Sequence, residues 1–535
     1  MKTQCLPFAQ IPHTTRLFLD YLSYKPSVHE FYPRSPLFPE WVKEEAGRVR
    51  YDDARRQKVS DILERQNRNF GAGPKTLANI ERLRRGAVAA VTGQQVGLFG
   101  GPLFSIFKAL TAVKLAEQAS MAGVECVPVF WLATEDHDLA EINHVALAAE
   151  GGLESLTVTS HGIEDAPVGG IRLGPEVEPV VERAVALLGD SEVGTWLREA
   201  YRPGETLGSA FGRLMAKLFA DWGVILLDQY DPAFHELAKP ILRQAIERSA
   251  ELDEALLARG KAIEAAGYHQ QVKVTSASTL LFEIQNGART AVRRKGEGEF
   301  VVGEQRSSAQ ELLDRIEANP VNFSPNALLR PVVQDYLLPT LVYTGGPAEV
   351  AYFAQAAVVY EQLMGRVTPV LPRFSATLVE AKAQRVLEHF QLTLSDMFQG
   401  PEKLREMLAT RALPSELQGQ FADAKATLET SLAAIRESLA RLDSTLVDAA
   451  SNAEEKMQYQ LSQLQARAAR AEVLRNEVVT RKANFMSGAL YPNKALQERE
   501  VAGVSFVARY GAGLLQSLYE AIHTDCHDHQ MIEVS

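Results

Sequence analysis

The chain has 535 residues, of which 46% are apolar and 23% charged, and this composition excludes a disordered, collagenous or low-complexity protein. Its 56 Lys and Arg against 67 Asp and Glu give a formal net charge of −11, which disfavours binding of nucleic acid over a broad basic face. We therefore expect no nucleic-acid partner, while a local basic pocket for a small anionic substrate remains compatible with this charge.

The cysteines and the apolar runs indicate a cellular compartment. Cys5, Cys126 and Cys526 are far apart and form no Cys-x-x-Cys pair, which argues against a disulfide framework or a structural zinc site and fits a reducing compartment. The N-terminus lacks the apolar core of a signal peptide, and runs such as residues 124–133 are far shorter than the roughly 18–20 residues that cross a bilayer. The sequence predicts a cytoplasmic protein that does not contact a membrane.

The first 378 residues predict a helical cap followed by an α/β core. Residues 1–85 are rich in helix formers and are expected to form an N-terminal cap. Residues 86–378 are expected to form a Rossmann-like core, since short apolar segments typical of buried parallel strands alternate with helical patterns. The expected strands are 87–92, 124–133, 223–228, 339–343 and 367–371, with a helix over 103–119. An insertion at about 251–330 contains a β-hairpin signature around Asn286-Gly287.

Residues 379–487 predict an α-helical coiled coil. Apolar residues are spaced 4-3-4-3-4, which is a heptad seam, at Leu428, Leu432, Ile435, Leu439, Leu442 and Leu446. One continuous helix over 415–485 would be roughly 100 Å long. We favour a helical hairpin, because Ser451–Glu454 and Asn452–Glu455 both resemble capping boxes that would divide the segment. The seam predicts a homodimer, and residues 488–535 are expected to pack back on the core.

A glycine-rich loop, residues 92–102, lies between the first core strand and the following helix. Gly93, Gly97, Gly100 and Gly101 would let the backbone approach a ligand, and the free N–H groups of the helix start favour an anion. The loop contains neither a P-loop nor a Gly-x-Gly-x-x-Gly motif. The side chains expected to bind the ligand are Gln94, Gln95 and Lys108. A tight turn that binds nothing is the alternative.

Polar residues also follow the second core strand. Three carboxylates and an imidazole stand at Glu135, Asp136, His137 and Asp138, with Asn143 shortly after. Ligands of open α/β sheets bind at the carboxyl ends of the strands. Such a group could orient an amine, act as a general base or hold a metal, although no His-x-x-x-His signature is present. We interpret the first four as catalytic candidates and Asn143 as a substrate-binding one, and we assign no metal site.

Two further polar segments flank the last two core strands. Arg373 suits a carboxylate or a phosphate, and Gly345-Gly346 places a flexible turn before a helix start. The remaining binding candidates are Arg330, Gln334, Asp335, Glu349, Tyr352, Gln355 and Ser375. Each segment could also consist of capping and turn residues alone. All four polar loops follow strands, so we expect them to converge on one edge of one sheet.

Five blocks of this sequence resemble those of the bacillithiol-biosynthesis cysteine-adding enzymes, also called cysteine ligases. The blocks are TGQQVGLFGGPLFSIFKA (92–109), VFWLATEDHDLAEINH (129–144), LLRPVVQDYLLPTLVYTGGPAEVAYFAQ (328–355), VLPRFS (370–375) and LYPNKALQER (490–499). Their order is preserved over nearly the whole chain. The resemblance implies a nucleotidyltransferase-type core, similar to that of class I aminoacyl-tRNA synthetases, with insertions and a dimerising coiled coil.

The resemblance also implies an activity, the last step of bacillithiol synthesis, in which cysteine is joined through an amide to the amine of glucosaminyl-malate. Lys108 and the glycine loop would bind phosphate or carboxyl oxygens, while Asp136, His137 and Asp138 would position the amine and accept its proton. Arg330 or Arg373 would hold the malate carboxylates, and Glu349 the ammonium of cysteine.

Some assignments stay open at the sequence level. No His-x-Gly-His follows the first strand and Arg373-Phe374-Ser375 lacks paired lysines, so the use of ATP, an adenylate intermediate and a metal requirement are undecided. Two other functions are compatible with the same segments: a different nucleotidyltransferase-like enzyme or amine ligase on this scaffold, and a catalytically inactive coiled-coil scaffold protein.

Overall fold

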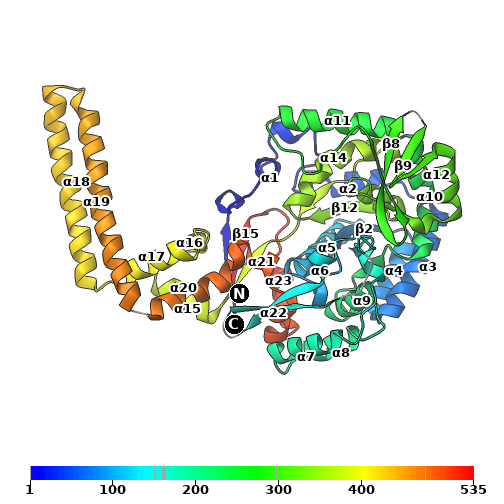
Figure 1. Cartoon of the computed structure of the whole chain (residues 1–535), viewed down its shortest axis with the longest axis horizontal. Helices are drawn as coiled ribbons and strands as arrows, with labels where there is room; N and C mark the ends of the chain where they lie inside the picture. Colours follow the sequence, from blue (N-terminus) through cyan, green and yellow to red (C-terminus); the bar gives the residue numbers. More distant parts are fainter. Residues whose placement is uncertain (1, 150–151, 160–163, 297, 476) are drawn as a thin grey trace. The chain divides into compact units, whose positions relative to one another are not determined.

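The structure is a computed structural model that describes residues 2–149, 152–159, 164–296, 298–475 and 477–535. The chain divides into two compact units (Figure 1). The larger unit consists of Thr3–Ala376 and Glu498–Gln530, and the smaller one mainly of Thr377–Gln497 and Met531–Ser535. The chain crosses from one unit to the other within three elements: β14 (Ala376–Glu380), α21 (Gln497–Glu500) and β15 (His529–Val534).

A five-stranded parallel sheet forms the centre of the larger unit. Its strand order is β13-β12-β2-β3-β6, and all neighbouring strands are parallel. The strands are β2 (Val88–Gln94), β3 (Cys126–Leu132), β6 (Ile225–Asp228), β12 (Thr340–Gly345) and β13 (Val370–Pro372). Each of the five predicted core strands is thus present. They are buried on both faces, which explains their continuous apolar sequences.

Helices cover the sheet, and the order of the strands reverses at β2. From β2 the chain proceeds to β3 and β6 on one side, and β12 and β13 lie on the other side. Ligands of doubly wound sheets bind at such a switch point, outside the carboxyl ends of the strands. The helices of this unit are α1 (Arg16–Leu22), α2 (Phe38–Arg48), α3 (Asp53–Phe70), α4 (Pro74–Arg84), α5 (Phe104–Met121), α6 (Leu139–Ile142), α7 (Val177–Leu188), α8 (Glu192–Ala200), α9 (Leu207–Leu218), α10 (Pro232–Glu247), α11 (Ser249–Ala265), α12 (Ala309–Ala318), α13 (Arg330–Leu337), α14 (Pro347–Met364), α22 (Gly503–Tyr510) and α23 (Gly513–Ala521).

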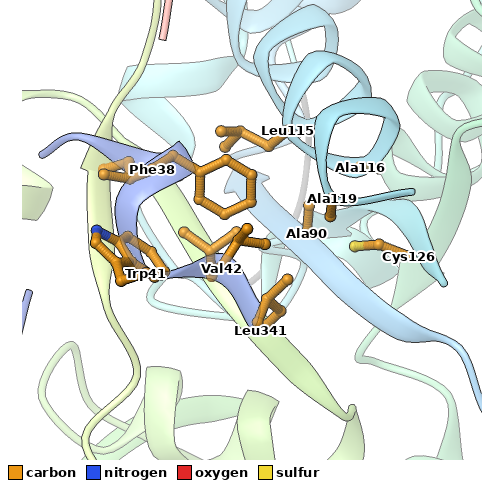
Figure 2. Close-up of a cluster of buried hydrophobic side chains, with 11 residues drawn as sticks. Phe38, Trp41, Val42, Ala90, Leu115, Ala116, Ala119, Cys126 and Leu341 are labelled. Atoms are coloured by element: carbon orange, nitrogen blue, oxygen red, sulfur yellow. The ribbon is translucent and has the colours of Figure 1, made fainter. Parts of the chain in front are cut away.

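The N-terminal helix α2 is part of the hydrophobic core. Phe38, Trp41 and Val42 project from α2 toward Leu115 of α5 and Leu341 of β12 (Figure 2). Phe38 and Trp41 pack edge to face, with ring centroids 5.2 Å apart. Removing α2 would therefore expose one face of the parallel sheet, which ties the first 85 residues to the core energetically.

An antiparallel sheet stands beside the parallel one in the larger unit. Its order is β10-β9-β8-β7-β11, formed by β7 (Ser278–Gln285), β8 (Ala288–Gly296), β9 (Glu299–Val302), β10 (Gln305–Ser308) and β11 (Phe323–Pro325). The predicted hairpin turn lies between β7 and β8, where Asn286 and Gly287 have φ of 53° and 86°. Positive φ at both positions is what a two-residue type I′ turn requires. A separate hairpin joins β4 (His144–Ala149) to β5 (Gly152–Thr157).

The smaller unit is a set of helices that includes a long helical hairpin. Its helices are α15 (Ala381–His389), α16 (Leu394–Met397), α17 (Pro401–Ala412), α18 (Ser415–Leu442), α19 (Leu446–Arg475) and α20 (Glu477–Leu490). Helices α18 and α19, of 28 and 30 residues, lie side by side along their length (Figure 1). This confirms the predicted hairpin and excludes one continuous helix over 415–485.

The predicted position of the hairpin turn is wrong. The chain reverses at Asp443-Ser444-Thr445, where Asp443 leaves the helical conformation and its carboxylate accepts a hydrogen bond from Thr445 N at 2.9 Å. Ser451 and Asn452 instead lie inside α19. A Ser-x-x-Glu spacing also places two side chains on one helix face, so it indicates a helix start only where the preceding residues are not themselves helical.

In the described part of the chain, no helix is long and apolar enough to span a bilayer.

Candidate active site

A cavity of about 230 Å³ lies at the carboxyl ends of the parallel strands. Its walls come from the segments that follow β2, β3, β12 and β13, together with α5, α13, α14 and Arg499. The predicted site residues that line it are Gly93, Gln94, Gln95, Lys108, Asp136, Arg330, Gln334, Gly346, Glu349, Tyr352 and Arg373. The structure thus brings together residues from all four polar segments, as far as 280 positions apart in the sequence.

Lys108 and Glu349 form a buried ion pair at the base of this cavity. Lys108 Nζ lies 2.6 Å from Glu349 Oε2, 2.8 Å from Gly93 O and 2.9 Å from Gln94 Oε1. An ammonium group carries three protons, so these acceptors use its full donor capacity. Lys108 therefore ties the end of β2 to the start of α14, and it could reach a ligand only by releasing one of these partners.

Glu349 is fixed as tightly as its partner. Tyr343 Oη donates to its Oε1 at 2.6 Å and Gly346 N to its Oε2 at 2.7 Å. Burial alone would raise the pKa of Glu349, but Lys108 and these two donors outweigh it and hold the pKa below its ordinary value. The turn needs glycine beneath this carboxylate, because a Cβ on Gly345 would stand 2.7 Å from Glu349 Cβ.

Asp136 presents a second fixed carboxylate to the cavity. Its Oδ2 accepts a hydrogen bond from Gln95 Nε2 at 3.0 Å and lies 3.7 Å from Arg330 Nη1. Burial would raise its pKa, yet Arg330, Gln95 and Arg289 lower the pKa of Asp136 below its ordinary value. Gln95 Nε2 also donates to Glu141 Oε2 at 2.9 Å, so one amide bridges two carboxylates. The cavity therefore keeps negative charge at this wall near neutral pH.

Arg373 supplies the opposite charge and retains an unused donor. Its Nη2 donates to Glu498 Oε1 at 2.6 Å and its Nη1 to Phe374 O at 2.7 Å. Its Nε is buried and has no hydrogen-bond partner among the described residues. This Nε lies 3.7 Å from where a Cβ on Gly346 would stand, beside the cavity. A buried N–H without an acceptor is costly, and an anionic group of a ligand would satisfy it.

The cations cluster around one aromatic ring. Phe104, near the start of α5, has the guanidinium of Arg373 at 5.1 Å, that of Arg499 at 5.8 Å and Lys108 Nζ at 5.7 Å from its ring centroid. Arg330 also lines the cavity, so four cationic side chains contribute to its walls. The site thus combines anion-binding groups with the carboxylates of Asp136 and Glu141 in one cavity.

The other residues predicted to be catalytic do not line the cavity. Glu135 is buried and its Oε1 lies 2.9 Å from His235 Nε2, in an internal pair. Asp138 is the N-cap of α6, where its Oδ1 accepts from Glu141 N at 3.0 Å. His137 is partly exposed beside Asp136, with its Nδ1 3.3 Å from Arg289 Nη1.

Several predicted binding residues serve the scaffold instead of the cavity wall. Asp335 accepts hydrogen bonds from Tyr360 Oη and Gln334 Nε2, and Gln355 bonds both backbone polar groups of Val272. Ser375 Oγ donates to Glu498 Oε2 at 3.0 Å, which helps to orient the partner of Arg373. The members outside the cavity lining are Asn143, Asp335, Gln355, Ser375, Gly97, Gly100, Gly101 and Gly345.

Sequence reasoning missed Phe104, Glu141, Tyr343 and Arg499 as cavity residues, and Arg289 beside the cavity. Glu141 and Arg499 lie within two of the blocks quoted above, where a polar residue near a predicted motif was a usable signal. Arg289 stands in a hairpin that the sequence places far from the other segments, so no local pattern marks it.

Among the described residues, no three His, Cys, Asp or Glu side chains are grouped to hold a metal ion.

Two family models together match almost the whole chain. Residues 1–374 match the model described as "Bacillithiol biosynthesis BshC, N-terminal Rossmann-like domain", and residues 376–534 match "Bacillithiol biosynthesis BshC, C-terminal coiled-coil domain". The chain belongs to the BshC family. The resemblance seen in the five sequence blocks is therefore confirmed, as is the Rossmann-like fold with an α-helical coiled-coil domain.

Curated BshC proteins are similar to this chain over its full length. The relative from Koribacter versatilis is 48% identical over 535 residues, covering 100% of both chains, and that from Solibacter usitatus is 37% identical over 538 residues, also covering 100% of both. The relative from Salinibacter ruber is 34% identical, covering 97% of this chain and 96% of its own. Each of these BshC relatives is named "Putative cysteine ligase BshC".

Proposed function

We propose that the protein is a ligase that joins the carboxyl group of cysteine to the amine of glucosaminyl-malate, forming the amide bond of bacillithiol. Membership of the BshC family and the names of its relatives support a cysteine ligase. The observation that supports the proposal best is that one cavity is lined by both charges, with the guanidinium groups of Arg330, Arg373 and Arg499 and the carboxylates of Asp136 and Glu141.

Both substrates carry charges that such a cavity would recognise. The malate carboxylates match the unused Nε of Arg373 and the guanidinium groups around Phe104. The ammonium of cysteine matches Asp136, whose pKa is held low, so that it stays ionised. Glu349, which the sequence assigned to this role, already accepts bonds from Lys108, Tyr343 and Gly346. We assign the ammonium to Asp136 because its contacts with Arg330 and Arg289, at 3.7 and 3.8 Å, are longer than the 2.6 Å contact between Lys108 and Glu349.

Amide formation requires that the cysteine carboxyl be activated, because a free carboxylate reacts poorly with an amine in water. ATP is the co-substrate to test, since the loop of residues 92–102 connects a parallel strand to α5 in the position where this type of core binds phosphates. The amine must also lose a proton as the bond forms. Glu141 lines the cavity, forms no ion pair with the residues that the structure describes and is our candidate acceptor.

The assay combines purified protein with cysteine and glucosaminyl-malate, with and without ATP and divalent cations, and detects the thiol product by mass spectrometry. We expect product with the intact chain and at least about 100-fold less with Asp136→Asn, because that change removes the charge that holds the ammonium. Asp314→Asn, an exposed position on α12, is the matched control and should keep full activity. Folded protein that gives no product under any of these conditions would refute the assignment.

We also propose that the protein forms a homodimer through the helical hairpin. Large apolar side chains remain exposed on α18 and α19, including Ile435 at 50%, Leu442 at 78% and Leu464 at 56% exposure. An exposed heptad seam of this kind favours a partner helix. Light scattering should give twice the chain mass of 58.9 kDa. Ile435→Glu should shift the mass toward the monomer, whereas Ala433→Glu, at an exposed position away from the seam, should not.

A further inference from the structure

Arg289 is held rigidly at the edge of the candidate active site. Its Nε donates to Ser324 Oγ at 2.8 Å and its Nη2 to Pro325 O at 2.5 Å, while its guanidinium stacks on Phe282, 4.1 Å from the ring centroid. The side chain is only 6% exposed. These contacts leave Nη1 directed at the loop after β3, where it lies 3.3 Å from His137 Nδ1.

The chemistry of arginine decides the direction of that contact. A guanidinium group has only N–H donors and stays protonated in proteins, so the hydrogen bond must run from Arg289 to His137 Nδ1. A ring nitrogen that accepts a hydrogen bond carries no proton. In a neutral imidazole the proton must then be on Nε2.

The other charged groups around His137 do not offer Nδ1 a better partner. Asp136 Oδ1 is 3.6 Å from Nδ1, and that oxygen already accepts the backbone N–H of His137 at 3.0 Å. Asp136 also faces Arg330 at 3.7 Å and Arg289 at 3.8 Å, so its charge is shared with two cations. The Phe282 ring, 6.3 Å from the imidazole centroid, adds no charge.

We propose that Arg289 is a positioning residue that holds His137, beside Asp136 at the edge of the cavity, as the neutral Nε2–H tautomer, so that its Nε2 is a hydrogen-bond donor and not a base. The catalytic part of this inference rests on the proposed ligase function, whereas the tautomer does not. A neutral imidazole N–H is suited to stabilising an oxygen that gains negative charge during attack on a carboxyl carbon. The proton released by the amine would then go to a cavity carboxylate.

Nuclear magnetic resonance of protein with ¹⁵N-labelled histidine rings tests the tautomer directly and requires no substrate. The His137 signals are assigned by their loss in His137→Gln. Near neutral pH we expect Nδ1 to show the shift of an unprotonated acceptor and Nε2 that of an N–H. An imidazolium, or a proton on Nδ1, in the wild-type protein would overturn the proposal whether or not any ligase activity is found.

Substitution of Arg289 tests whether this residue sets the tautomer of His137. Arg289→Met should allow the Nδ1–H tautomer or the imidazolium and lower kcat about 10–100-fold with a much smaller change in KM. Arg293→Met, an exposed position on the same strand, is the control and should change neither. Unchanged His137 signals in folded Arg289→Met would refute the positioning role. If Arg289→Met does not fold, the wild-type tautomer still decides the proposal.

Substitution of His137 by glutamine or asparagine tests whether its Nε2 acts as a hydrogen-bond donor or as a base. The amide nitrogen of glutamine can stand where Nε2 of histidine does, whereas that of asparagine stands nearer Nδ1. We expect His137→Gln to keep product formation within about 10-fold of wild type and His137→Asn to lose about 100-fold or more. Equal losses in the two variants would contradict a donor role for Nε2. Absence of product from the wild-type protein would refute the proposed function and leave the spectroscopic test of the tautomer intact.

Discussion

Removal of the Lys108 charge tests whether the buried pair with Glu349 holds the active-site end of the sheet together. Lys108→Met keeps the length of the side chain but leaves a carboxylate that is 18% exposed without its cation. Breaking a buried ion pair by removing one partner typically costs about 3–5 kcal/mol of the free energy of unfolding. Because Tyr343 and Gly346 still donate to Glu349, we expect a loss near the lower value, about 3 kcal/mol.

The matched variants are Glu349→Gln and the double variant. If the two charges stabilise each other, the double variant should lose less free energy of unfolding than the two single variants lose together, by at least about 1 kcal/mol. Urea unfolding followed by tryptophan fluorescence reports on this region, because Trp131 lines the same cavity. A loss of about 3 kcal/mol corresponds to a fall of about 1 M in the urea midpoint at a slope of about 3 kcal/mol per M.

The contribution of Glu349 to stability should change with pH in opposite directions in Lys108→Met and in the wild-type protein. In the wild-type protein the pKa of Glu349 is lowered, so the pair contributes stability at neutral pH that is lost as the pH falls through the folded-state pKa. Without Lys108, Glu349 keeps its burial, which is the largest influence on its pKa, and loses the largest opposing one. We therefore expect its pKa to rise above that of the unfolded chain, so that acidification stabilises the folded state of the variant. The loss caused by Lys108→Met should therefore shrink between pH 7 and pH 5. A loss below about 1 kcal/mol that does not change with pH would refute a stabilising pair.

Three further predictions concern other parts of the larger unit. Gly345→Ala should destabilise the protein by about 1–3 kcal/mol in urea unfolding, since the added methyl group would overlap the side chain beneath it, and an unchanged midpoint would contradict this close packing. A limiting amount of iodoacetamide at pH 8 should label Cys5 and Cys526 before Cys126, because burial raises the pKa of the Cys126 thiol to about 12; peptide mapping by mass spectrometry would expose the reverse order. Binding of cysteine to Asp136→Asn, measured by calorimetry, should weaken at least about 10-fold, and equal affinity would place the ammonium elsewhere.

The sequence carried enough information for the core strands because their signal is local. The apolar runs that became β2, β3 and β12 needed only their composition and the turn residues beside them. Convergence of Gln94, Asp136 and Arg373 on one cavity followed from a general rule about the carboxyl ends of parallel strands. The helical hairpin was also predicted, but from two capping patterns that lie inside α19, so the division into two helices is confirmed and the position of the turn is not.

The roles within the site were less accessible, because a side chain's function depends on contacts between distant segments. No sequence pattern shows that the ammonium group of Lys108 is paired with Glu349, or that Glu135 is paired with His235 inside the protein. The same holds for Arg289, which reaches the site only because β8 folds beside the loop after β3. The turn at Asp443 was misplaced because a stronger capping pattern occurs eight positions later inside α19.

The Arg373–Glu498 pair has a consequence for how the protein is made on the ribosome. All five strands of the parallel sheet have been synthesised by residue 372, but the carboxylate that buries Arg373 arrives 125 residues later. At about 5–20 residues per second, this interval lasts about 6–25 s. During that time the nascent sheet carries a solvated arginine at its edge, and the anion-binding wall becomes complete only after the helical hairpin has been translated.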